Sequence, residues 1–262
     1  MPNLYKLNYD LAYMYESLIR KIKEKKSLKN LDDEFIKEYV NNYFKDNPKI
    51  KEILEKHPKP ERSKEFKDII KEVRNELNRM YGIFKLDKNL ALESHTSTME
   101  RIRIYPYIYK KIFSITGEPK RILDISCGLN PLSYKYLGYK PYYIATELTK
   151  KDCDILEKYF KKEGIKGEVL HVDLFKDYKF PKADVAFLFK VLSNLNDKKL
   201  AERIINNLEV KYIIASFSLI TVGGRRMNYP LQGWFQRLLK RLNLKYNLIK
   251  EENEIFYVIK KN

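Results

Sequence analysis

Two stretches decide the fold: RILDISCGLNP at residues 121–131 and PYYIATE at residues 141–147. Each holds a short apolar run, and the first run ends in a turn of small residues that opens onto a helical segment. Each run also ends in an acid, Asp124 in the first and Glu147 in the second. Because parallel strands end at one edge of a sheet, where open α/β sheets bind ligands, we expect both acids at a ligand site.

The same alternation of apolar runs and helical segments continues from these stretches to residue 260. We expect strands at about 120–126, 142–147, 167–172, 184–189, 211–217, 244–250 and 254–260, and helices at about 131–137, 149–162, 197–207 and 229–242. A polar turn joins the last two strands, which would add an antiparallel strand to a parallel sheet. The pattern predicts an α/β, Rossmann-like sheet of seven mostly parallel strands, the class I methyltransferase variant of the doubly wound fold.

Residues 1–92 have a different periodicity. Their apolar side chains recur at steps of three and four residues, as at Leu11, Met14, Leu18 and Ile22, which is typical of amphipathic helices. Lysines crowd the outer faces of these helices. We therefore expect an all-α, basic RNA-binding domain at residues 1–92 and a methyltransferase domain at residues 93–262.

The charge of the chain narrows the class of partner. Lys and Arg number 52 against 35 Asp and Glu, a formal net charge of +17. A lysine-rich proteome would explain many lysines but not this imbalance, so nucleic acid is the favoured partner and an anionic membrane surface a distant second. No apolar run is long enough to span a bilayer. Cys127 and Cys153 lack metal-ligand spacing, so we expect no metal and a reducing, cytoplasmic location. We also expect the protein to be a monomer.

Three consecutive predicted strands end in acids: Asp124, Glu147 and Asp173. A carboxylate such as Glu147 suits two neighbouring ribose hydroxyls, because it can accept a hydrogen bond from each. Asp173 beside Leu174 offers an acceptor and an apolar surface to adenine. Each acid alone has an ordinary alternative, such as capping the next helix. Together with the turn at Ser126 and Gly128, the three favour an adenosyl ligand.

The segment HTSTMER, residues 95–101, precedes the sheet. Ser97 and Glu100 have capping-box spacing, so we expect a helix to begin there and to be kinked or ended by Pro106. The first N–H groups of such a helix and the side chain of Arg101 would bind an anion, for which the carboxylate of a methionyl group is a natural candidate. The alternative is an ordinary capped helix with a surface arginine.

The fourth strand leads into Lys190, which should lie at the reactive end of the ligand. The Asn-Pro-Pro-aromatic segment of enzymes that methylate exocyclic amines is missing here, and so is a Pro-Cys nucleophile. A target with a free lone pair, such as guanine N7, needs neither. Arg225 and Arg226, after two glycines, are candidates for contacts with RNA phosphates or guanine. Trp234 could stack on a base, but a lone helical tryptophan is more often part of the core.

Three segments together, residues 95–101, 124–132 and 216–235, resemble the aminoglycoside-resistance 16S ribosomal RNA methyltransferases, which modify guanine N7 in the decoding-site helix. This resemblance implies a helical basic N-terminal domain, a methyltransferase domain, S-adenosylmethionine as cofactor and the small ribosomal subunit as partner. It also implies which residues contact the cofactor. These would be His95, Thr96, Ser97, Arg101, Ser126 and Gly128, with Glu147, Asp173 and Leu174 holding the adenosine and Phe189 lining its pocket.

The chain departs from that family at two positions. Ser126 stands where the family usually has glycine, and Ser218 where it has proline. The composition favours an archaeal or thermophilic relative over an antibiotic producer. Two alternatives stay open: a methyltransferase acting on another RNA, a protein or a small molecule, and a non-catalytic RNA-binding ribosome-assembly factor of the same fold.

Overall fold

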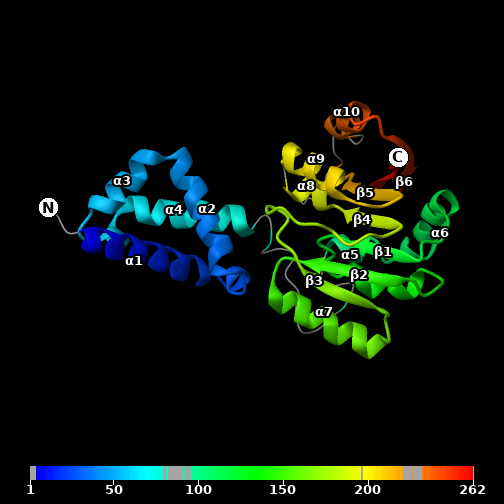
Figure 1. Ribbon diagram of the computed structural model, residues 1–262, viewed down its shortest axis with the longest axis horizontal. Coiled ribbons are helices and arrows are strands. Elements are labelled where there is room, and N and C mark those ends of the chain that lie inside the picture. The colour runs from blue at the N-terminus through cyan, green and yellow to red at the C-terminus, as the bar shows by residue number, and fades with distance from the viewer. Residues whose placement is uncertain are drawn as a thin grey trace. The chain divides into compact units, whose positions relative to one another are not determined.

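The computed structural model describes residues 4–78, 81, 91, 96–195, 197–220, 226 and 232–261, with the side chains of 4–10, 96, 97 and 194 excepted. The chain divides into two compact units, residues 1–85 and residues 86–262 (Figure 1). The predicted domain boundary at residues 92 and 93 lies outside the described residues. Among the helices that are described, none combines the length and the apolar character needed to cross a membrane.

The first unit is a bundle of helices, so the expected helical N-terminal region is confirmed. Its elements are α1 (Leu4–Lys23), η1 (Lys26–Leu28), α2 (Asp33–Asp46), α3 (Pro48–Lys56), η2 (Pro60–Arg62) and α4 (Lys64–Leu77). The apolar stripes face one another: Leu18 and Ile22 of α1 and Ile69 of α4 are completely buried. Ser63 begins α4, because its side chain accepts a hydrogen bond from the N–H of Phe66 at 3.1 Å.

The second unit is built on a seven-stranded sheet in the order β3-β2-β1-β4-β5-β7-β6, which confirms the predicted fold. The strands are β1 (Arg121–Asp124), β2 (Tyr142–Glu147), β3 (Gly167–His171), β4 (Val185–Phe189), β5 (Tyr212–Ser218), β6 (Lys245–Lys250) and β7 (Glu254–Lys260). The first five strands are parallel, and β7 pairs antiparallel with both β5 and β6. Glu254 therefore starts β7 opposite Ser218, at the edge where the parallel strands end.

Helices cover both faces of the sheet (Figure 1). Helices α8 (Val191–Leu195), α9 (Lys198–Asn207) and α10 (Gly233–Arg241) pack into the apolar core on one face. Helix α6 (Tyr105–Thr116), the 3-10 segment η5 (Asn130–Tyr136) and helix α7 (Lys150–Glu163) pack into the core on the other. The predicted helix at 131–137 is thus a 3-10 segment.

The register between β2 and β3 depends on a glycine. A Cβ atom on Gly167 would lie 1.9 Å from the carbonyl oxygen of Tyr143, so no larger residue fits there without moving the backbone. This pairing aligns Glu147 with His171 at the ends of the two strands. The glycine therefore helps to fix where the acid at the end of β2 is presented.

The segment before the sheet differs from the prediction. Helix α5 covers only Thr96–Met99, and Ser97 lies within it instead of capping it. A turn follows, and Pro106 occupies the first turn of α6, where its missing N–H costs no hydrogen bond. The proline therefore neither kinks nor ends a helix, and a four-residue helix offers too weak a dipole to serve as the expected anion site.

Candidate active site

Asp124, the last residue of β1, lies completely buried at the carboxyl edge of the sheet. Its Oδ2 accepts hydrogen bonds from the hydroxyl of Tyr143 at 2.6 Å and from Nδ2 of Asn130 at 2.9 Å. Its Oδ1 is buried and has no hydrogen-bond partner among the described residues. Burial raises the pKa of Asp124 to about 6, against which the two hydrogen bonds act. Asp124 thus keeps one acceptor oxygen free for a ligand.

The turn after β1 is fastened to the end of β2. The N–H of Ser126 donates to Oγ1 of Thr146 at 3.0 Å, and the N–H of Cys127 donates to the carbonyl oxygen of Thr146 at 3.1 Å. Ser126 and Gly128 both have left-handed backbone conformations, with φ of 47° and 53°. The glycine adopts this conformation freely, whereas the serine is strained by its Cβ.

Glu147 closes the other side of this turn. Its Oε1 accepts a hydrogen bond from the N–H of Gly128 at 2.6 Å, and its Oε2 accepts one from the N–H of Leu148 at 3.1 Å. Burial and the nearby carboxylate of Asp152 raise the pKa of Glu147 to about 7, although the two N–H donors lower it. The acids predicted at the ends of β1 and β2 therefore flank one small-residue turn.

Asp173 and Leu174 follow the end of β3. Oδ1 of Asp173 accepts a hydrogen bond from the N–H of Phe175 at 2.9 Å. Its Oδ2 is buried and accepts no hydrogen bond from the described residues, although Nζ of Lys176 lies 3.6 Å away. Leu174 is buried in the apolar core. The N–H of Val172 donates to the carbonyl oxygen of Glu147 at 2.8 Å and so ties this segment to the second acid.

Arg101 is buried, with a side chain only 2% exposed, and is therefore not a surface arginine. Its Nε donates to both carboxylate oxygens of Glu254, at 3.0 and 2.8 Å. The guanidinium lies over the ring of Phe189, 4.9 Å from the ring centre. Burial would lower the pKa of Arg101, but Glu254 raises it above its ordinary value. Within the described part of the chain, the buried Nη2 has no hydrogen-bond partner.

Lys190 follows β4 and has a left-handed backbone, with φ of 60°. Its N–H donates to the carbonyl oxygen and to Oγ of Ser216, at 3.1 and 3.0 Å. Its ammonium nitrogen lies 2.5 Å from Oε2 of Glu100 and 3.7 Å from Oε2 of Glu254. The ammonium is thus held in a buried group of charges and does not project into solvent.

The other predicted site residues are placed less fully. His95 and Arg225 lie outside the described residues, and Thr96 and Ser97 lie in α5 without described side chains. Arg226 is exposed and forms an isolated antiparallel bridge with Ile220. Trp234 packs against Phe217 and Phe235 of the core, at ring-centre distances of 6.1 and 5.4 Å. Among the residues that the structure describes, no group of His, Cys, Asp or Glu side chains is placed to hold a metal.

Four residues of this site escaped the sequence analysis: Tyr105, Asn130, Thr146 and Glu254. Asn130 lies in the same turn as Gly128, and Thr146 directly precedes Glu147, so their positions could have indicated a role in the site. Tyr105 donates to Oδ1 of Asn130 at 2.9 Å from a helix that reads only as apolar. Glu254 is the first residue of the predicted strand at 254–260 and directly follows the polar turn that contains Glu251 and Glu252, so no local feature marked it as a site residue.

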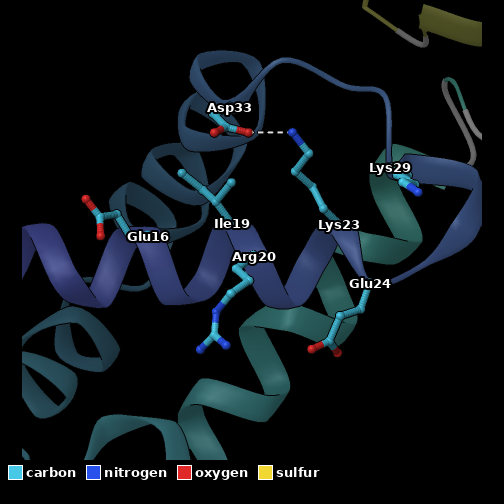
Figure 2. Close-up of a pocket in the computed structure, with 7 residues that line it drawn as sticks. All are labelled: Glu16, Ile19, Arg20, Lys23, Glu24, Lys29 and Asp33. Atoms are coloured by element: carbon cyan, nitrogen blue, oxygen red, sulfur yellow. Dashed lines mark hydrogen bonds and ion pairs between the residues drawn. The ribbon is translucent and has the colours of Figure 1, made fainter.

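A separate hollow lies in the first unit and does not involve these residues (Figure 2). It is lined by Glu16, Ile19, Arg20, Lys23, Glu24, Lys29 and Asp33. Lys23 points toward Asp33, and their charged atoms are 2.6 Å apart. Both signs of charge line the hollow and partly neutralise each other, so it has no character that selects one ligand.

The arrangement at the edge of the sheet suits an amino acid attached to a nucleoside. Nη2 of Arg101 is a buried cationic donor that lacks a described acceptor, and Oδ1 of Asp124 is a buried anionic acceptor that lacks a described donor. Buried polar groups of native proteins are normally hydrogen-bonded, so both atoms indicate a polar ligand. A carboxylate suits the first and an ammonium the second. Glu147 adds an acceptor for hydroxyl groups beside the turn.

This strand order, with an antiparallel seventh strand and acids at the ends of β1 and β2, defines the class I methyltransferase fold. The family model described as Ribosomal RNA methyltransferase (FmrO) matches residues 68–258. The chain belongs to this family.

Known proteins agree with this placement. The chain is 28% identical over 213 residues to a 16S rRNA (guanine(1405)-N(7))-methyltransferase of Proteus mirabilis, covering 75% of this chain and 74% of that protein. The structure of the 16S rRNA methylase RmtB has the same fold, with a TM-score of 0.74, 20% identity and coverage of 95% of this chain and 98% of that one. The 16S rRNA methyltransferase RmtF, solved with S-adenosyl-L-homocysteine, gives a TM-score of 0.72 at 18% identity, with coverage of 95% and 98%.

Proposed function

We propose that this protein transfers a methyl group from S-adenosylmethionine to N7 of a guanine in small-subunit ribosomal RNA. The observation that carries the proposal is the pair of buried atoms without described partners, Nη2 of Arg101 and Oδ1 of Asp124, beside Glu147 in a ribosomal RNA methyltransferase fold. Arg101 and Asp124 offer a hydrogen-bond partner to the carboxylate and the ammonium of the methionyl group, and Glu147 offers one to the ribose.

Different residues would bind different parts of the cofactor. Arg101 would bind the carboxylate of the methionyl group and Asp124 its ammonium, since each offers the opposite charge. Glu147 would accept from the ribose hydroxyls, as carboxylates do in nucleotide-binding α/β folds. Asp173 and Leu174 would receive the adenine edge and face. Phe189 would line the pocket beneath Arg101. His95, Thr96, Ser97, Ser126 and Gly128 are proposed as further contacts from the segments that flank the site.

S-adenosylmethionine supplies an electrophilic methyl group when it is bound. Guanine N7 carries a lone pair, so the protein need not remove a proton or form a covalent bond to the base. Its task is to hold the two reactants in line and to exclude water. The Proteus mirabilis relative is named for the N7 position of guanine 1405 in 16S rRNA, which supports this atom as the target.

Positive charge for RNA binding is spread over both units. Residues 1–85 contain 20 Lys and Arg and 15 Asp and Glu, whereas residues 86–262 contain 32 and 20. The excess is +5 in the first unit and +12 in the second, a similar density along the chain. We therefore propose that the helical unit binds RNA together with the basic surface of the methyltransferase unit, as a monomer in the cytoplasm.

Three cations are proposed near the target: Lys190, Arg225 and Arg226. Arg226 is exposed and free to meet a phosphate or a guanine edge. Lys190 is different, because it could touch the base only by leaving Glu100, which lies 2.5 Å from its ammonium nitrogen.

The test is transfer of labelled methyl from S-adenosylmethionine to purified small ribosomal subunits, free 16S rRNA and tRNA. We expect label in the small subunit, located at one guanine by chemical cleavage at N7-methylguanine. Transfer to a protein or small molecule instead would favour the first alternative. Binding of S-adenosylhomocysteine and RNA without any transfer would identify a non-catalytic ribosome-assembly factor.

A further inference from the structure

Glu254 is a buried charged residue to which the proposed function assigns no direct contact with cofactor or RNA. It begins β7, and its side chain is 2% exposed. Both of its oxygens accept from Nε of Arg101, and Oε2 also lies 3.7 Å from the ammonium nitrogen of Lys190. The two cations thus meet at a single carboxylate, which comes from a strand that is remote in sequence from both.

These three residues and Glu100 form a row of alternating charge. The order is Arg101, Glu254, Lys190, Glu100, with two positive and two negative groups. Burying charges is unfavourable, and removing one partner of a buried pair is more unfavourable than losing both. Glu254 holds the centre of this row, so the positions of both cations depend on it.

The contact with Glu254 fixes the direction in which Arg101 faces. A guanidinium is planar and rigid, so a carboxylate held at Nε determines where the two terminal nitrogens point. The ring of Phe189, 4.9 Å from the guanidinium carbon, restricts the plane from one side. Nη2 is left buried with no acceptor among the described atoms. Glu254 and Phe189 therefore orient Arg101 toward a ligand without needing to contact that ligand themselves.

We propose that Glu254 is a positioning residue for cofactor binding: it orients Arg101 so that Nη2 receives the carboxylate of the methionyl group. This inference rests on the proposed function. It assigns Glu254 no contact with the cofactor or with RNA. Loss of Glu254 should therefore weaken binding of ligands that carry the carboxylate and spare ligands that lack it.

The experiment is calorimetry with two ligands, S-adenosylhomocysteine and its decarboxylated form, which keeps the adenosine, the thioether and the amine. In Glu254→Gln we expect affinity for S-adenosylhomocysteine to fall about tenfold, as when a hydrogen bond to a charged group is lost. Affinity for the decarboxylated ligand should change less than about threefold. Glu254→Asp, which keeps the charge, should recover part of the loss.

Two further variants separate orientation from stability. Glu251→Gln is the matched control: Glu251 lies three positions earlier and pairs with Lys111 at 2.7 Å, and its loss should leave both affinities unchanged. Glu254→Gln combined with Lys190→Met removes one charge of each sign, so it balances the remaining Arg101 and Glu100 if the single variant fails to fold. The double variant should show the same carboxylate-specific loss.

The outcomes are distinct. If the folded variant loses affinity equally for both ligands, or loses affinity for neither, Glu254 is not a positioning residue. If the unaltered protein binds neither ligand and transfers no methyl group, the proposed function fails instead.

Discussion

The N–H of Gly128 donates to Oε1 of Glu147 at 2.6 Å, which joins the turn after β1 to the last residue of β2. The carboxylate that we expect to bind the ribose is thereby held against the turn. Its position is fixed before any ligand arrives, and its ionisation is coupled to that position, because the pKa of Glu147 is raised to about 7 by burial and by Asp152.

The first prediction concerns pH. Ionised Glu147 accepts hydrogen bonds from ribose hydroxyls better than the protonated form, so affinity for S-adenosylhomocysteine should fall several-fold between about pH 8 and pH 6. Glu147→Gln should bind more weakly and lose this step, keeping only the change caused by Asp124, whose pKa is about 6. Calorimetry between pH 6 and pH 8 measures these affinities. The same pH dependence in the variant and in the unaltered protein would contradict the role of Glu147 as the ribose acceptor.

The same shift predicts the opposite trend for the stability of the ligand-free protein. Because the pKa of Glu147 is raised from 4.5 to about 7 on folding, the folded state favours the protonated form. The contribution of Glu147 is full below pH 4.5 and is lost as pH rises to about 7. Denaturant titration should therefore show that the free energy of unfolding of the unaltered protein falls relative to that of Glu147→Gln as pH rises from about 4.5 to 7. A difference between the two proteins that does not change with pH would contradict the raised pKa of Glu147.

Arg101 provides a second prediction. Arg101→Lys keeps the charge, but one ammonium cannot replace Nε toward Glu254 and Nη2 toward a ligand in the same geometry. Affinity for S-adenosylhomocysteine should fall about tenfold or more. Arg103→Lys is the matched control, because Arg103 lies two residues away and is exposed. Similar calorimetric affinities for both variants would remove Arg101 from the site.

Ser126 provides a third prediction. Its backbone φ is 47°. In this left-handed conformation a residue with a Cβ atom destabilises the folded state by about 1 to 2 kcal/mol, whereas glycine does not. Glycine gains freedom in the unfolded chain, so Ser126→Gly should raise the free energy of unfolding by about 1 kcal/mol or less. Asn243→Gly is the comparison, since Asn243 has φ of 54° outside the site and asparagine tolerates this region better. A loss of stability in Ser126→Gly would show that the serine side chain is itself needed.

The fourth prediction uses the net charge of +17. Neutralising several phosphates makes affinity for RNA fall by about a thousandfold or more between 50 and 200 mM salt. Filter binding to small subunits should show this slope. A shallow slope would favour a protein or small molecule as the substrate.

Much of the fold follows from local sequence. The predicted strand at 142–147 agrees with β2 at both ends, because a continuous apolar run bounded by Pro141 and an acid leaves little choice. The predicted strand at 254–260 agrees with β7 in the same way. A helix does begin near Ser97, as expected, but it covers only Thr96–Met99 and Ser97 does not cap it. Capping-box spacing is a local signal, whereas Glu100 forms an ion pair with Lys190, 90 positions away.

The site was predictable only in part, for the same reason. The acids at the ends of β1 and β2 could be found, since strand ends are readable and sheet topology brings them together. The partners of Arg101 and Lys190 could not. The sequence places Glu254 at the start of a predicted strand, but it does not show that this strand lies antiparallel beside β5, which is what brings Glu254 inside.

The position of β7 also has a consequence for synthesis. Arg101 and Glu254 are 153 residues apart, so a growing chain can complete β1 to β5 while Arg101 still lacks its counter-ion. A product that stops short of β7 would carry the strand ends for the adenosine half of the site but leave Arg101 without its carboxylate, whereas Lys190 would keep its ion pair with Glu100. We expect such a fragment to be unstable, because a buried guanidinium without a counter-ion is unfavourable.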